Sequence, residues 1–359
     1  MIIVIMAGGT GTRFWPYSTQ KEPKQFLPIL SDEPLLIDTC RRVKNIAGKN
    51  PILIVVSEIQ REILEQILEK YVDLNVEVLY EPILKDTAPC IALTSAYVAK
   101  KYSEDEVMVF LPSDHYIGNV NRFLQILEKA EELAREGNIV TIGIPISKPE
   151  TGFGYIQRGD VVDRTDISIY KVKCFVEKPN YVTAIEYLKS GEYFWNAGIY
   201  LFSPKTISAE IEKYEPELYE SLYTIKNSID THDFYRVLCD EFEKMKNISF
   251  DYAIMEKTTA PVYVLEGDFI WNDIGNWDAI FHLLKNSSID NVTSGNNVFY
   301  DARNNLVINK SNKLISLVGT SGLFVIETDK VVLVGSLDRA QDVKNLVKML
   351  ENNGMDKYL

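Results

Sequence analysis

Short apolar runs alternate with amphipathic stretches through roughly the first 145 residues of the chain. The runs that read as buried strands are residues 2–6, 52–56, 76–79, 107–111 and 139–144. Apolar positions recur at helical spacing in the intervening residues 59–68, 88–102 and 121–136. This alternation predicts βαβ units, and therefore an α/β fold with a mostly parallel, Rossmann-like sheet flanked by helices. Ser57 followed by Gln60 predicts a capping box before the first of these helices.

The pattern changes twice further along. From about residue 145 the segments are rich in turns, which predicts shorter strands inserted after the parallel sheet. After about Ser288, apolar runs separated by glycine and Asn/Asp turns follow at close spacing, at 297–300, 306–308, 314–318, 323–327 and 331–334, before a predicted helix over 339–350. No strict hexapeptide repeat is visible. We therefore expect two domains, residues 1–288 and a compact β domain over 289–359, since 359 residues exceed one typical core.

A glycine-rich loop follows the first predicted strand. It comprises Gly8, Gly9, Thr10, Gly11 and Thr12, and Arg13 and Lys24 lie just beyond it. Glycines allow backbone N–H groups to approach an anion, and two cations could neutralise a polyphosphate there. The spacing is neither that of the P-loop nor G-x-G-x-x-G. A tight turn with two surface cations is the alternative, but the whole segment 8–28, called the signature segment below, favours a nucleotide site.

The signature segment resembles that of sugar-nucleotide pyrophosphorylases, which join a nucleoside triphosphate to a sugar 1-phosphate. Its residues 14–16 (FWP) and 24–26 (KQF) are similar to the mannose-1-phosphate guanylyltransferase branch. Further matches in family order are 111–115 (LPSDH), 152–156 (GFGYI), 175–179 (FVEKP), 195–198 (WNAG), 249–257 (SFDYAIMEK) and 271–275 (WNDIG). The resemblance therefore extends over essentially the whole chain.

The resemblance implies a nucleotidyltransferase domain followed by a small left-handed β-helix. It implies an enzyme that makes GDP-mannose and pyrophosphate from GTP and mannose 1-phosphate, by magnesium-assisted attack of the sugar phosphate on the α-phosphorus. The nucleophile is already an anion, so positioning and charge neutralisation carry the catalysis. Two alternatives stay open: a pyrophosphorylase for another sugar 1-phosphate or nucleotide, and a catalytically silent nucleotide-sugar sensor.

Two aspartates are the candidate Mg²⁺ ligands. Asp114 follows a buried strand and Asp273 stands in the turn-like segment 271–275. Each alone would be read as a turn-capping residue, but both fall on metal-binding positions of the family. Magnesium commonly takes only one or two protein carboxylates, with phosphates and water completing its shell.

The remaining candidates divide between the two substrates. Arg13 and Lys24 are expected to neutralise the β- and γ-phosphates, and Lys178 to orient the sugar phosphate; these three are the candidate catalytic residues. The expected nucleotide-binding set is Gly8, Gly9, Thr10, Gly11, Thr12, Arg13, Lys24, Glu81, Thr87, Ala88 and Ser113. The expected sugar-binding set is Gly154, Glu177, Lys178 and Asn196. A surface Glu–Lys pair is the alternative for residues 177 and 178.

Glu81 is the candidate reader of the base. It ends a predicted strand and precedes Pro82, so its carboxylate can point into the cleft. Guanine presents two adjacent N–H donors, which an acceptor-only carboxylate matches. The alternative is a solvent-facing Glu81, with the base held by backbone at Thr87 and Ala88.

Composition narrows the other partners. The formal net charge of −13 argues against a nucleic-acid partner, because such a surface repels a polyanion. The four cysteines are far apart without a C-x-x-C pair, which favours free thiols over zinc or disulfides. No signal peptide and no bilayer-spanning stretch is recognisable, so we expect a cytoplasmic protein without a membrane partner. A homodimer is possible.

Overall fold

A nine-stranded sheet forms the centre of the molecule in the computed structural model, which describes residues 1–359 apart from 10, 20, 286 and 288. The strand order is β3-β2-β1-β4-β9-β6-β10-β8-β7. The strands are β1 (Ile2–Met6), β2 (Ile52–Ser57), β3 (Val76–Glu81), β4 (Met108–Pro112), β6 (Ile139–Pro145), β7 (Tyr155–Asp163), β8 (Ile169–Val176), β9 (Tyr193–Phe202) and β10 (Val262–Glu266). Pairing is parallel from β3 to β4 and between β6 and β10, and antiparallel where β9, β8 and β7 join.

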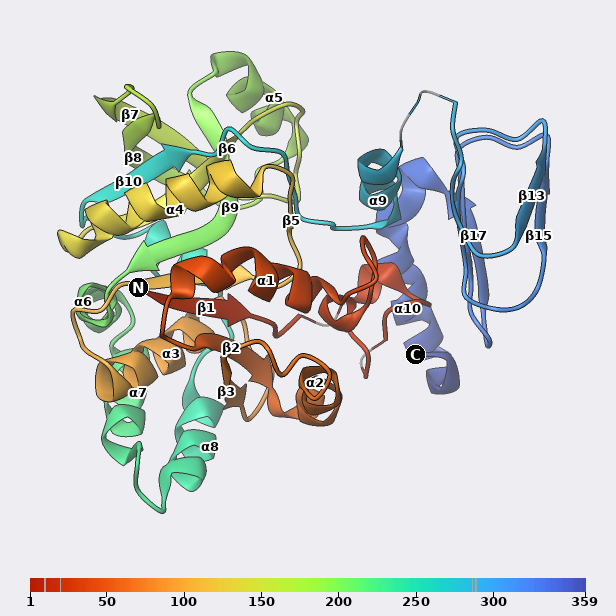
Figure 1. Cartoon of the computed structure of the whole chain (residues 1–359). Helices are drawn as coiled ribbons and strands as arrows, with labels where there is room; N and C mark the ends of the chain where they lie inside the picture. Colours follow the sequence, from red (N-terminus) through yellow and green to blue (C-terminus); the bar gives the residue numbers. More distant parts are fainter. Residues whose placement is uncertain (10, 20, 286, 288) are drawn as a thin grey trace.

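Helices cover both faces of the sheet, as Figure 1 shows. Alternate residues of β1 point to opposite faces: Ile3 and Ile5 pack in the core that contains α1 and α4, whereas Ile2 and Val4 pack in the core that contains α3. The helices are α1 (Leu35–Ala47), α2 (Arg61–Leu68), α3 (Thr87–Lys101), α4 (Val120–Arg135), α5 (Tyr181–Ser190), α6 (Pro204–Tyr214), α7 (Pro216–Ser228), α8 (Phe234–Lys244), α9 (Trp277–Leu284) and α10 (Val343–Asn352). The continuous apolar runs thus mark strands that are buried on both faces.

Two local expectations were wrong, and one helix was missed. The middle of the chain does not hold short strands, because β7, β8 and β9 contain 9, 8 and 10 residues and four helices, α5 to α8, follow or separate them. The Ser57 side chain does not cap the turn after β2; Gln60 instead donates through Nε2 to the Gly9 carbonyl at 3.4 Å. Helix α1 was not predicted.

The C-terminal strands stack as two small sheets. One has the order β12-β14-β16-β17 and the other pairs β13 with β15, with parallel pairing except between β16 and β17. The strands are β12 (Val292–Ser294), β13 (Asn297–Tyr300), β14 (Leu306–Asn309), β15 (Ile315–Val318), β16 (Leu323–Glu327) and β17 (Val332–Ser336). This β-helix-like unit lies to the right in Figure 1, beside α9 and α10.

The C-terminal unit shares a core with the signature segment. Phe14 and Trp15 pack in one apolar cluster with Leu306, Phe324 and the α9 residue Trp277. Trp15 also donates through Nε1 to the carbonyl of Tyr358 at 2.6 Å. The residues that directly follow the predicted nucleotide loop therefore pack against the C-terminal unit.

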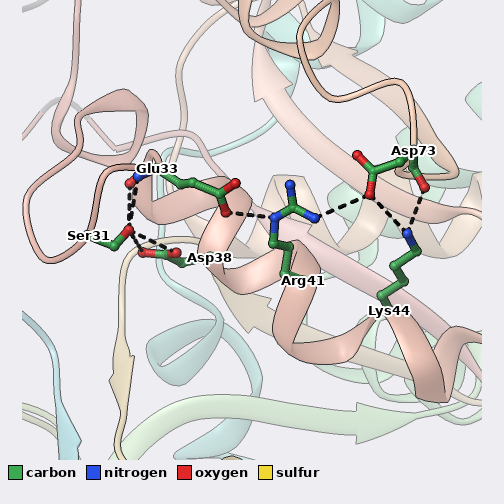
Figure 2. A network of polar contacts seen from close by, with 6 residues as sticks. All are labelled: Ser31, Glu33, Asp38, Arg41, Lys44 and Asp73. Carbon is green, nitrogen blue, oxygen red and sulfur yellow. Dashed lines mark hydrogen bonds and ion pairs between the residues drawn. The ribbon is translucent and has the colours of Figure 1, made fainter.

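An exposed polar network fixes α1 to its surroundings (Figure 2). Arg41 reaches Glu33 at 2.7 Å and Asp73 at 3.2 Å, and Lys44 reaches the same Asp73 carboxylate at 3.1 Å. Ser31 and Asp38 complete the network. Each exposed pair contributes little by itself. The inner side of α1 matters more for the site, because Thr39 donates to the Ser113 carbonyl at 3.1 Å.

All four cysteines are free, and Cys40 and Cys90 are buried. Among the described residues, none of the helices combines the length and the apolar character needed to cross a membrane.

Candidate active site

The glycine loop is held by a glutamine from the signature segment. Gln25 donates through Nε2 to the carbonyls of Ala7 at 2.6 Å and Gly9 at 3.0 Å. Gly11 has φ +63°, and a Cβ there would stand 2.7 Å from the Lys24 amide nitrogen. Only glycine permits that close approach in the left-handed region. The loop and the segment around Lys24 therefore form one packed unit.

The larger of two adjoining cavities, about 490 Å³, opens at the carboxyl ends of β1, β3 and β4. Its lining residues are Met6, Gly8, Gly9, Glu81, Leu84, Lys85, Asp86, Thr87, Cys90, Pro112, Ser113, Asp114 and Asn247. Five predicted nucleotide residues are therefore brought together: Gly8, Gly9, Glu81, Thr87 and Ser113. This is the edge at which ligands bind to open α/β sheets.

Other members of the predicted nucleotide set lie outside that lining. Thr10 is outside the described residues. Thr12 borders a small hollow with Trp15 and Val347 instead, and Gly11, Arg13, Lys24 and Ala88 are not among the residues that line the larger cavity. Ala88 is buried at the start of α3, where its N–H donates to the Ile248 carbonyl at 3.2 Å.

Glu81 is buried in the larger cavity without a charged partner among the described residues. Its side chain is 2% exposed and its Oε1 has no hydrogen-bond partner. A Cβ on Gly8 would stand 3.3 Å from Oε2. Burial raises the pKa of Glu81 to about 8, because the charged form is poorly solvated there. An unpartnered buried acceptor of this kind can take a hydrogen bond from a molecule bound in the cavity.

A second cavity of about 230 Å³ adjoins the first and shares Met6, Thr87 and Pro112 with it. Its other lining residues are Ile91, His115, Gly152, Phe153, Gly154, Glu177, Asn196, Ala197, Gly198, Tyr200, Asp251, Trp271 and Asp273. It contains three of the four predicted sugar residues. A Cβ on Gly154 would stand 2.5 Å from Glu177 Oε2, so glycine makes room for that carboxylate.

Lys178 lies beside this second cavity without lining it. Its side chain is 58% exposed and pairs with Glu177, whose side chain is 9% exposed. Its φ is +46°, in the left-handed region, although a residue before proline is expected to be extended. Backbone strain of this kind is concentrated at functional sites.

Lys24 joins the two candidate metal ligands. It is buried, and its Nζ lies 2.9 Å from Asp114 Oδ2. The same Nζ donates to the carbonyls of Asp273 at 3.1 Å and Ile274 at 2.7 Å. Ile274 has φ +46°, which is a strained conformation for a β-branched residue. All three ammonium protons are thereby used to hold the two aspartate segments together.

The two aspartates differ in electrostatic environment. Burial raises the pKa of Asp273, against the opposing charges of Lys24 and Arg13. Burial also acts to raise the pKa of Asp114, but Lys24 and the neighbouring hydrogen bonds outweigh it and hold that pKa below its usual value. A Cβ on Gly275 would stand 2.6 Å from Asp273 Oδ2, so the carboxylate lies folded against its own turn.

The donor set fits a phosphate-bridged cation. Asp114 lines the larger cavity and Asp273 the smaller one. The described residues contain no group of three or more His, Cys, Asp and Glu arranged to hold a metal. Two carboxylates suffice for magnesium when substrate phosphates supply further oxygens.

Comparisons with known proteins agree along the whole chain. Residues 2–288 match the nucleotidyl transferase family model, and residues 295–350 match a MannoseP isomerase/GMP-like beta-helix domain. Mannose-1-phosphate guanylyltransferases from Escherichia coli and Klebsiella pneumoniae are each 37% identical over 360 residues, which is 100% of this chain and 75% of theirs. The chain belongs to the mannose-1-phosphate guanylyltransferase family.

A solved structure from Thermus thermophilus, named a mannose-1-phosphate geranyltransferase, is 32% identical with a TM-score of 0.86. The match covers 98% of this chain and 99% of that one. The predicted family, fold class and enzyme class are therefore confirmed. Nucleotidyltransferases of this family act on small-molecule substrates, a nucleoside triphosphate and a sugar phosphate, and generally use a divalent metal.

Several polar residues of the smaller cavity were not predicted from the sequence. Asp251 accepts hydrogen bonds from Asn196 at 2.8 Å and from the Tyr200 hydroxyl. His115 accepts at Nδ1 from Trp271 Nε1 at 3.2 Å, and burial lowers the His115 pKa to about 4, so its ring is neutral. Asp251 lies in the family-like segment 249–257, but one aspartate in a pattern gave no reason to place it in the pocket.

Proposed function

We propose that this chain transfers the guanylyl group of GTP to mannose 1-phosphate, giving GDP-mannose and pyrophosphate. The observation that carries the proposal is the meeting of two cavities at Met6, Thr87 and Pro112, with Asp114 on one side and Asp273 on the other. A nucleotide in the larger cavity and a sugar in the smaller one would bring their phosphates together at that junction. We take residues 1–288 as the catalytic domain and 289–359 as the C-terminal domain.

The phosphate end of the reaction needs positive charge. We propose Arg13 and Lys24 for the triphosphate and departing pyrophosphate, and Lys178 for the sugar phosphate. Arg13 acts electrostatically on Asp273, which supports its place near the reacting phosphates. The Lys24 ammonium contacts Asp114 and the backbone carbonyls of residues 273 and 274, so its positive charge lies beside both candidate metal-ligand segments. Because the attacking phosphate is already an anion, these residues need only orient and neutralise.

Mg²⁺ is the proposed metal, with Asp114 and Asp273 as its protein ligands. When bound, it neutralises charge that develops on the phosphate oxygens. The chain's own part is to hold both carboxylates at the junction, which Lys24 does by bridging their two segments. Gly275 adds to this, because only a residue without Cβ leaves room for the Asp273 carboxylate.

Glu81 is proposed as the guanine reader. Its unpartnered Oε1 supplies an acceptor inside the larger cavity. The alternative, recognition by backbone N–H groups at Thr87 and Ala88, is less favoured because those groups already donate to Asp86 Oδ1 and the Ile248 carbonyl. Guanine's adjacent N1–H and N2–H₂ would satisfy the carboxylate and favour its charged form.

A turnover panel tests the proposed function directly. Each of the common nucleoside triphosphates is combined with mannose, glucose and other hexose 1-phosphates, and pyrophosphate release is measured with and without Mg²⁺. We expect the GTP and mannose 1-phosphate pair to have the highest kcat/KM. Higher efficiency with another pair would replace the substrates, and binding without turnover by any pair would favour a nucleotide-sugar sensor.

We also propose that the enzyme works in the cytoplasm, without a nucleic-acid or membrane partner, and that it forms a homodimer. Exposed apolar side chains on β13, β15 and β17 support the dimer, among them Tyr300 and Val318. Light scattering of Tyr300→Lys beside the wild type tests it. A wild type that elutes as a monomer at micromolar concentration would contradict it.

A further inference from the structure

The side chain of Asn196 is already committed within the protein. Its Oδ1 accepts from the Gly198 N–H at 3.0 Å. Its Nδ2 donates to the Tyr200 hydroxyl at 2.7 Å and to Asp251 Oδ1 at 2.8 Å. An amide nitrogen has two protons, and both are used. Asn196 is therefore poorly placed to bind a ligand through its donors, although it lines the smaller cavity.

Two side-chain hydrogen bonds of this network end on one oxygen of Asp251. Oδ1 accepts from Asn196 and from the Tyr200 hydroxyl, both of which extend from β9. Within the described residues, no side chain donates to Oδ2. Asp251 nevertheless lines the smaller cavity, at the start of a helical turn over Asp251–Met255. One oxygen is anchored, and the other remains available to a ligand.

We propose that Asp251 is a sugar-binding residue, which accepts a hydrogen bond from a ring hydroxyl through Oδ2, and that Asn196 and Tyr200 act as positioning residues through Asp251 Oδ1. The inference rests on the proposed function, in which the smaller cavity takes the hexose of a sugar 1-phosphate. It assigns a hydroxyl contact to Asp251, which the sequence had not singled out, and a supporting role to Asn196, which the sequence had placed in the sugar-binding set.

Glu177 completes the same recognition surface. It lines the smaller cavity together with Asp251, and its negative charge contributes to the raised pKa of that carboxyl. Lys178 holds one Glu177 oxygen, while Oε2 faces Gly154. Two fixed carboxylates, each with one anchored oxygen, match two hydroxyl donors on one face of a hexose. Burial raises the pKa of Asp251 to about 6, so the carboxylate still predominates at neutral pH.

Asp251→Asn isolates the free oxygen. The amide oxygen can still accept from Asn196 and Tyr200, but an NH₂ group replaces Oδ2 and cannot accept from a hydroxyl. We expect the KM for mannose 1-phosphate to rise about tenfold or more, because hydrogen bonds to charged groups are the stronger ones. The KM for GTP should change less than about twofold. Asp240→Asn, at an exposed position of α8, is the matched control and should change neither KM.

Deoxy sugars separate a contact from a purely structural role. Turnover of mannose 1-phosphate and its 2-, 3-, 4- and 6-deoxy analogues is compared in wild type and Asp251→Asn. If Asp251 binds one hydroxyl, removing that hydroxyl should cost the wild type much and the variant little, while the other deletions cost both proteins equally. A structural role would lower activity toward all analogues by the same factor, and that result would overturn the proposal.

Tyr200→Phe provides a second variant that keeps Oδ2 and removes one anchor of Oδ1. We expect a rise of about two- to fivefold in the KM for the sugar 1-phosphate, with GTP unaffected. This variant carries the test if Asp251→Asn does not fold. An unchanged sugar KM in both variants, with an active wild type, would overturn the role of Asp251 alone. An inactive wild type would contradict the proposed function, and the same comparison would then use whichever sugar 1-phosphate the protein binds in calorimetry.

Discussion

The two cavities are built in different ways. In the larger cavity, Glu81 is buried and its Oε1 has no hydrogen-bond partner among the described residues. In the smaller one, Asp251 and Glu177 are each fixed by neighbours, through Asn196, Tyr200 and Lys178. Side chains that are already held by hydrogen bonds lose little conformational entropy when a sugar binds. The unpartnered Glu81 oxygen, by contrast, gains a hydrogen-bond partner only when a ligand binds. Substitutions should therefore disturb the sugar side more strongly than the base side.

The largest effect should come where the two cavities meet. Asp114→Asn and Asp273→Asn should each lower kcat by about a hundredfold or more, because an amide is a poor magnesium ligand. Turnover as a function of Mg²⁺ concentration is the measurement, with circular dichroism to confirm folding. Wild-type activity of either variant at limiting magnesium would remove that aspartate from the metal site.

Lys178→Ala is expected to have the next largest effect. It should raise the KM for the sugar 1-phosphate far more than that for GTP, and lower kcat if the charge also acts in the transition state. The exposed Lys205→Ala, on α6, is the control. Unchanged sugar KM and kcat in Lys178→Ala would contradict the assignment.

A matched pair of glycine substitutions compares the two cavities directly. In Gly154→Ala the new Cβ would stand 2.5 Å from Glu177 Oε2, whereas in Gly8→Ala it would stand 3.3 Å from Glu81 Oε2. We expect a rise of about tenfold or more in the sugar KM for the first and less than about threefold in the GTP KM for the second. The first Cβ displaces a carboxylate that Lys178 holds, whereas the second requires a shift of only a few tenths of an ångström. Steady-state kinetics with each substrate varied in turn provides both values. Equal effects in the two variants would remove the contrast between the cavities.

Glu81→Gln should have the smallest effect on turnover but a clear effect on selectivity and on stability. The wild type should prefer GTP to ITP, which lacks the 2-amino group, and the variant should lose much of that preference. An unaltered ratio of kcat/KM for GTP and ITP would exclude Glu81 as the reader.

The stability of the same variant should depend on pH in a defined direction. The folded pKa of Glu81 is about 8 against an ordinary value of 4.5, so the folded state binds the proton more tightly. The protonated Glu81 side chain therefore favours the folded state. Its contribution to the free energy of unfolding is fully present below pH 4.5 and is lost as the pH rises toward 8. Glu81→Gln should therefore gain stability relative to the wild type as pH rises, by an amount on the order of a few kcal/mol. Urea unfolding across that range measures it, and a pH-independent difference would show that Glu81 is not buried as described.

The strands of the central parallel sheet could be predicted from the sequence. Continuous apolar runs such as Ile2–Met6 are buried on both faces, so their period and length are readable. The middle strands were misread because β7 alternates buried and exposed positions irregularly, with register shifts against β8. Helix α1 was missed because its start after Pro34 carries no side-chain cap.

The candidate site was readable only in part, for a physical reason. Gly8 and Asp114 follow strand ends and Glu81 is the last residue of a strand, and these ends of a parallel sheet lie together. Asp251 reaches the smaller cavity through contacts with β9 more than 50 residues away in sequence, and no local pattern encodes such a meeting. For the same reason, the bridge from Lys24 to Asp114 and Asp273 could not be seen from spacing.

We propose that the base is recognised in the larger cavity and the sugar in the smaller one. The most direct test of this proposal is a side-by-side measurement of both KM values in Glu81→Gln and Asp251→Asn, with GTP and mannose 1-phosphate each varied at saturation of the other. We expect Glu81→Gln to change only the KM for GTP, and Asp251→Asn to change only the KM for mannose 1-phosphate. Equal changes in both constants, or an exchange of the two effects, would contradict it.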